Sequence, residues 1–89
     1  MAHEIDKIIN KTETILERDR VACCKVVLPN KEDAKALHDM ITDNLIFLID
    51  PIIIGSCVIA IIKPCDLDVY HEMIEYSATE LIATHVCII

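Results

Sequence analysis

Glycine and tryptophan are almost missing from this chain of 89 residues. Gly55 is the only glycine, and there is no tryptophan. A phosphate-binding loop or a dinucleotide fingerprint needs several glycines within a few residues, so the sequence argues against both. Positive charge is also scarce, because 8 Lys and Arg stand against 15 Asp and Glu, for a formal net charge of −7. A direct nucleic-acid interface needs clustered positive charge, so any contact with nucleic acid should come through a partner.

Cysteine pairs and metal-ligand spacings are lacking as well. The cysteine count is odd, no C-x-x-C occurs, and the chain starts without a signal-peptide pattern, so we expect reduced, buried thiols in the cytoplasm. Cys23 and Cys24 should point to opposite faces of a strand, which favours core packing over a redox or metal role. The histidines have no ligand spacing to a cysteine, and we predict no metal and no cofactor. The cysteines are Cys23, Cys24, Cys57, Cys65 and Cys87, and the histidines are His3, His38, His71 and His85.

Apolar residues, in contrast, are in excess. They make up 54% of the chain, and seventeen of the 89 residues are isoleucine. We expect one domain over residues 1–89, because a chain this short cannot divide its interior into two cores. A small globule also cannot hide so many apolar side chains, and exposed apolar patches usually mark a contact with a partner. The composition therefore predicts a subunit of an obligate oligomer.

The first half of the chain predicts two helices around a strand. Apolar residues at spacings of three and four predict an amphipathic helix within residues 1–19, ahead of a core at 20–89. The run at residues 20–28 predicts a strand that ends at Pro29. Asn30 is then a suitable N-cap for a short helix over residues 31–42.

Two interpretations compete for Leu45–Ile62, where fourteen of eighteen residues are apolar. A membrane span needs about 20 apolar residues, but Asp50 and Pro51 would both be costly in one. The Ile and Val content favours strands. We therefore predict a hairpin, with strands near 45–54 and 57–63 and a turn at Gly55 and Ser56, and no membrane partner.

Asp66 is a suitable N-cap for a last helix over residues 67–84. The predicted fold class is α+β: a three-stranded antiparallel sheet with two helices on one face (βαββα), plus the N-terminal helix. An alternative makes Thr84–Ile89 a closing strand of a ferredoxin-like βαββαβ core. The last helix is apolar over more than one face, and we expect its second stripe to be a partner interface formed by Val69, Met73, Tyr76 and Ala83.

Catalytic patterns are weak throughout. His71, Glu72 and Glu75 could form an acid–base group on one helix turn, but a solvated helix face is the commoner explanation. No nucleophile lies in a recognisable motif with a histidine and a carboxylate. We therefore predict no catalytic residues and no enzyme activity.

Two segments carry a resemblance to a known family. Leu28–His38 resembles the strand-to-helix corner of the Pcc family, the small dimer-forming subunit of the KEOPS complex, and Gly55–Asp66 resembles that family's last strand and the start of its second helix. The likeness takes in roughly 70 of the 89 residues. The chain departs from the family at His71, where an arginine is usual, and at Glu75 and Tyr76, where an Asn-Ser pair is usual.

The resemblance implies a non-catalytic dimerisation or scaffold subunit that supports threonylcarbamoyladenosine modification of tRNA. The implied partners are a second copy or a paralogous subunit, as homodimer or heterodimer, and the KEOPS transferase subunit. The departures remove polar and basic groups, so tRNA would be contacted only indirectly, as in a divergent paralogue. Two alternatives stay open: a shell-type oligomeric protein of bacterial microcompartments, and a small ferredoxin-like ligand-binding module.

Overall fold

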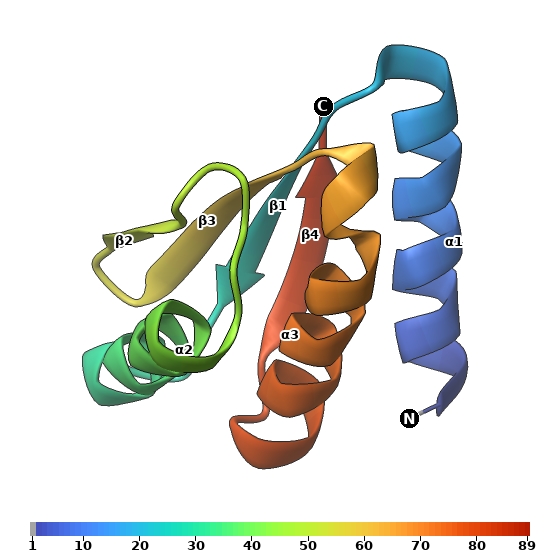
Figure 1. The fold of residues 1–89 in the computed structure, drawn as a ribbon. Helices are drawn as coiled ribbons and strands as arrows, with labels where there is room; N and C mark the ends of the chain where they lie inside the picture. Colours follow the sequence, from blue (N-terminus) through green and yellow to red (C-terminus); the bar gives the residue numbers. More distant parts are fainter. Residues whose placement is uncertain (1) are drawn as a thin grey trace.

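The structure, a computed structural model, describes the backbone of residues 2–89 and the side chains of residues 4–89. It is an α+β fold in which helices lie on one side of an antiparallel sheet, as Figure 1 shows. The strand order in the sheet is β2-β3-β1-β4. In chain order the elements are α1 (Ala2–Asp19), β1 (Ala22–Val27), α2 (Lys31–Asn44), β2 (Ile52–Ile54), β3 (Cys57–Ile62), the 3-10 turn η1 (Pro64–Asp66), α3 (Leu67–Glu80) and β4 (Thr84–Ile88).

The prediction of a three-stranded sheet was wrong, and the alternative with a closing strand is the one observed. Helix α3 ends at Glu80 instead of residue 84, and β4 then pairs antiparallel with β1. The chain reverses at Ile82, which has a φ of 50°. A left-handed residue after a helix is a common C-terminal stop, but it is usually glycine. Because isoleucine occupies this position, the sequence hides the end of the helix.

From β1 to β4 the order is strand, helix, two strands, helix and strand, and β1 lies between β3 and β4. This is the βαββαβ arrangement called ferredoxin-like. Helix α1 is an addition to it. It contacts α3, β1 and β4, and Ile9, Ile15 and Leu16 of α1 are buried in the common core.

The first arm of the hairpin is shorter than predicted. Only Ile52–Ile54 forms a strand, and residues 45–51 are a loop. Leu45 and Phe47 are buried, and the backbone N–H of Leu48 donates to Asp66 Oδ1 at 3.1 Å. Pro51 has no N–H to give to a sheet, so pairing starts only after it. The predicted turn at Gly55 and Ser56 is confirmed, with a φ of 60° at Gly55.

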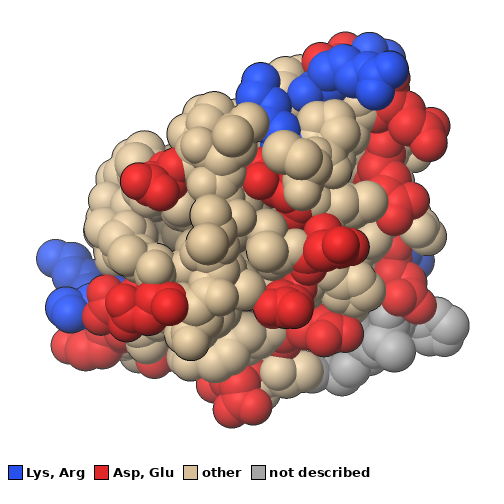
Figure 2. All heavy atoms as spheres, viewed as in Figure 1, with Lys and Arg blue, Asp and Glu red and all other residues tan. Residues whose placement is uncertain are grey.

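Of the charged side chains that the structure describes, Asp66 alone is buried. Figure 2, drawn from the same side as Figure 1, shows acidic side chains spread over the surface in view and basic ones mainly at its rim. Of the helices that the structure describes, none combines the length and the apolar character that crossing a bilayer would require.

Candidate functional site: the open face of the sheet

The sheet has one covered face and one uncovered face. Figure 1 shows the three helices side by side along the same side of it, and contacts of α3 with both α1 and α2 agree with this. Successive side chains of a strand point to opposite faces, and burial alternates accordingly in β1 and β3. We call the uncovered side the open face. With the register of the strands, it consists of Cys23, Lys25, Val27, Ile52, Ile54, Cys57, Ile59, Ile61, Thr84, Val86 and Ile88.

Most of the open face is apolar and in contact with solvent. Ile52 is 54% exposed, Ile54 58%, Ile61 38%, Val86 40% and Ile88 46%. Four strands about 4.8 Å apart and about five residues long give a flat footprint of about 300 Å². The largest apolar patch of a monomeric protein is typically about 300–600 Å² and is often functional, so the open face is a candidate binding surface.

Lys25 is the single charged residue of the open face. It lies on β1 opposite Ile59 of β3 and Val86 of β4, and its neighbours on the same strand face are Cys23 and Val27. Lys25 is half-buried, and it takes part in none of the ion pairs among the described side chains. A cation thus lies within an apolar surface that offers it no carboxylate.

Two further exposed apolar side chains lie in the loop before β2, which is bonded to η1 and α2 on the helix side of the sheet. In the loop before β2, Ile46 is 87% exposed and Leu48 67% exposed. Asp66 holds this loop in place, because its carboxylate accepts the N–H groups of Leu48 and Lys63, at 3.1 and 3.0 Å. The side chain predicted to cap α3 therefore fixes the neighbouring loop, and it makes no capping bond to α3.

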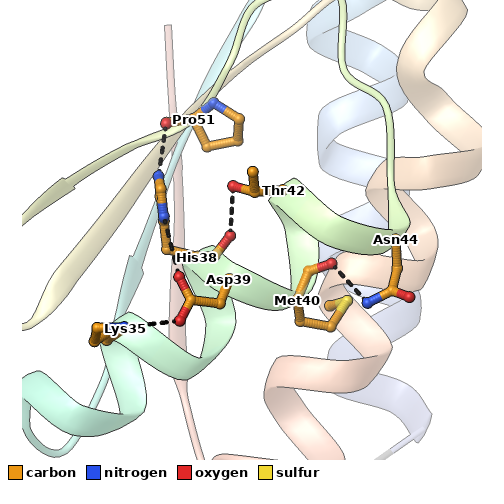
Figure 3. Close-up of polar contacts among 7 residues, drawn as sticks. All are labelled: Lys35, His38, Asp39, Met40, Thr42, Asn44 and Pro51. Carbon is orange, nitrogen blue, oxygen red and sulfur yellow. Dashed lines mark hydrogen bonds and ion pairs between the residues drawn. The ribbon is translucent and has the colours of Figure 1, made fainter.

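Figure 3 shows how α2 holds the other end of the same loop. His38 Nε2 lies 3.2 Å from the carbonyl oxygen of Pro51, to which it donates when Nε2 carries the proton. Lys35 Nζ pairs with Asp39 Oδ2 at 3.0 Å, one turn apart on the exposed side of the helix. His38 is therefore tied to the backbone of the loop, and its contacts are structural.

The four residues predicted to form a partner interface do not form an exposed surface. Met73 is fully buried in the chain's own core, while Val69, Tyr76 and Ala83 are half-buried against that core. The second apolar stripe was expected to need a partner, but contacts of α3 with α1 and α2 account for it. Their role at a partner interface stays a prediction.

A buried polar network joins α1, α3 and the sheet. Tyr70 is fully buried, and its hydroxyl lies 2.9 Å from Thr12 Oγ1 and donates to Cys24 Sγ at 3.4 Å. Thr12 Oγ1 donates to the carbonyl of Ile8 and lies 3.3 Å from Cys87 Sγ. Burial raises the pKa of the Cys24 thiol to about 12 and also raises the pKa of Tyr70. A protonated thiol is a poor nucleophile, so this network serves stability.

One serine and one histidine meet in a way that the sequence did not predict. Ser77 Oγ of α3 and His85 Nε2 of β4 form a short hydrogen bond, and Ser77 Oγ also donates to the carbonyl of Ile74. Ser77 has no exposed surface, so no substrate can reach its hydroxyl. Burial lowers the pKa of His85. The pair joins β4 to α3 and does not have the access of a catalytic dyad.

The predicted acid–base candidates stay on the surface. His71 Nε2 lies 3.3 Å from Glu75 Oε1, one turn along α3, with side chains 49% and 59% exposed. Within residues 4–89, no three His, Cys, Asp or Glu side chains converge as a metal site would require. The described side chains thus give the open face, and no catalytic cluster, as the candidate site.

The sequence did not point to the open face, because the excess of apolar residues was attributed to the last helix. A signal was nonetheless available. The strand at Cys57–Ile62 is apolar at every position, and a strand with one solvated face usually alternates with polar residues. Comparisons with protein-family models, with curated proteins and with solved structures find no match for this chain.

Proposed function

We propose that this chain is a non-catalytic assembly subunit that binds another protein chain through the open face of its sheet. The observation that carries the proposal is an apolar sheet face left without a covering layer. Sheets in two-layer folds bury one face against helices, and a second apolar face is buried by packing on another layer.

The geometry of the face suits packing by a second layer. Two packed sheets lie about 10 Å apart and interdigitate the side chains between them. Burying the remaining exposed half of an isoleucine contributes about 1 kcal/mol, before the entropic cost of association is subtracted. Ile52 and Ile54 on β2 and Ile88 on β4 are exposed in this way, so each would contribute to the interface.

The more specific proposal is the dimerisation or scaffold role in KEOPS that the resemblance implies, in a cytoplasmic complex that acts on tRNA. Its support is the strand, helix, hairpin, helix order from Ala22 to Glu80 and a net charge of −7, which suits indirect contact with tRNA. Strand β4 is the element that the resemblance does not predict. Reconstitution with the KEOPS transferase subunit tests this role, and failure to form a complex of defined stoichiometry would remove it without touching the assembly proposal.

The assembly proposal is tested by the mass of the native particle that contains the chain. We expect that mass to exceed the 10.0 kDa of one chain. Ile54→Asp places a carboxylate on the open face, two strands away from Lys25, and should return the chain to 10.0 kDa. The matched control is Ile82→Asp, the same change at a position 83% exposed in the turn before β4, and it should leave the mass unchanged. A parent chain that is monomeric in its native extract contradicts the proposal.

A further inference from the structure

We infer that the open face is built for a different protein, not for a second copy of this chain: a partner whose apolar surface carries one carboxylate opposite Lys25. The inference rests on the proposed function and names the partner's chemistry. It is carried by the position of Lys25 among the eleven side chains of the open face.

Lys25 lies well inside the face. It is on β1, which has β3 on one side and β4 on the other, and it is near the middle of the strand, between Cys23 and Val27. The other ten residues of the open face are isoleucine, valine, cysteine and threonine, so none of them can neutralise the ammonium group. A layer packed on this face would remove Lys25 from water without supplying a counter-charge from this chain.

A second copy is a poor fit for that position. A two-fold interface places the same patch on both subunits, so residues near its centre lie close to their own copies. Two open faces would therefore bring two ammonium groups and no carboxylate into one apolar layer, and like charges in such a layer are strongly disfavoured. Each copy also carries a net charge of −7, which adds repulsion between the subunits.

A partner with a carboxylate resolves the conflict. A lysine paired with a carboxylate at the centre of an interface can be desolvated, and the pair selects that partner against others. The apolar side chains then provide contact area, and Lys25 provides discrimination. Before the partner binds, the ammonium group of Lys25 also disfavours packing of the open faces of two copies against each other, as charged residues do on natural sheets.

The test uses this chain as its own probe. Lys25→Glu gives an open face with the opposite central charge, and Lys25→Met gives a face with none. We expect the parent and Lys25→Glu to be monomeric when each is alone. An equimolar mixture of the two should form a 1:1 dimer, at least tenfold tighter than either self-association, by sedimentation velocity. Lys25→Met should self-associate, and Ile54→Asp introduced into both components should abolish the mixed dimer.

The other outcomes separate the inference from the proposed function. A parent dimer that Ile54→Asp disrupts would overturn the inference and leave the assembly proposal standing. Self-association of Lys25→Met without a mixed dimer would likewise overturn the requirement for a carboxylate while keeping the face as an assembly surface. If the parent, the mixture and Lys25→Met are all monomeric while circular dichroism shows each to be folded, the inference fails, and the mass of the native particle decides the assembly proposal separately.

Discussion

The two faces of the sheet are similar in composition and opposite in environment. On the helix side of β3, Val58, Ala60 and Ile62 have no exposed surface, whereas on the open face Ile61 of the same strand is 38% exposed. The polar groups of the covered side satisfy one another, as Tyr70 does with Thr12 and Cys24. The open face has one charged residue, Lys25, and no partner for it. Both faces of the sheet are therefore apolar enough to be buried, but the helices of this chain cover only one of them.

The largest expected effect comes from placing a carboxylate on each side of the sheet in turn and comparing the losses of stability. Met73→Asp buries an unpaired charge at a position with no exposed surface, and we expect a loss of at least about 3–5 kcal/mol in the free energy of unfolding, most of the stability of a small domain. Ile54→Asp on the open face, at a position that is 58% exposed, should cost the isolated chain less than about 1 kcal/mol. Urea denaturation followed by circular dichroism measures both. Equal losses would mean that the two faces are equally buried.

A second prediction concerns alkaline pH and the covered side. The pKa of Cys24 is raised by burial from its usual 9.0 to about 12, and the pKa of Tyr70 is also raised. The neutral groups therefore stabilise the fold fully below pH about 9, and that stabilisation should fall as the pH rises toward about 12. Cys24→Ala should flatten the decline of the unfolding free energy between about pH 9 and about pH 12.

Cys65→Ala is the control for this experiment, because Cys65 is exposed on η1. It should leave the slope of the pH dependence as it is in the parent. A parent slope that neither variant changes would show that Cys24 is not the group responsible.

The smallest expected effect concerns His85 and mildly acidic pH. Burial lowers its pKa below the usual 6.5, so the neutral ring stabilises the fold above pH about 6.5, and stability falls as the pH drops below that value. Glu4 and Lys7 of α1 line the same surface hollow as His85, so they share its surroundings. We expect a loss below about 1 kcal/mol, measured as a decrease in melting temperature. His85→Gln should reduce this decrease in melting temperature, whereas His71→Gln, on the exposed side of α3, should not. The reverse result would mean that His85 is not the group responsible.

Most of the elements could be predicted from the sequence, because local chemistry marks their ends. Asn30 caps α2 through a bond of 2.8 Å from the N–H of Asp33, and Gly55 marks the hairpin turn. The end of α3 could not be predicted in this way, since Ile82 takes a backbone conformation that isoleucine rarely adopts. With that end hidden, the sequence favours a three-stranded sheet, and the closing strand β4 is predicted only as the alternative.

The candidate site could be predicted only as a composition. An excess of apolar residues indicated an uncovered surface, but its place depends on which side α1 packs. The sequence predicts that α1 is amphipathic and does not say which surface receives it. In the structure Thr12 of α1 meets Tyr70 and Cys87, so α1 adds to the covered side and leaves the open face bare.

The most direct test of the open face uses the chain's own thiols. Cys23 and Cys57 each lie near the start of a strand, and because β1 and β3 are antiparallel they are at opposite ends of the open face, whereas the exposed Cys65 lies on η1. Thiol-alkylation rates should be measured residue by residue, in the isolated chain and in the native particle. We predict that assembly slows alkylation of Cys23 and Cys57 by about tenfold or more, as burial at an interface would, and leaves Cys65 unchanged. Equal rates for Cys23 and Cys57 in the two states would contradict the assignment of the open face as the assembly surface.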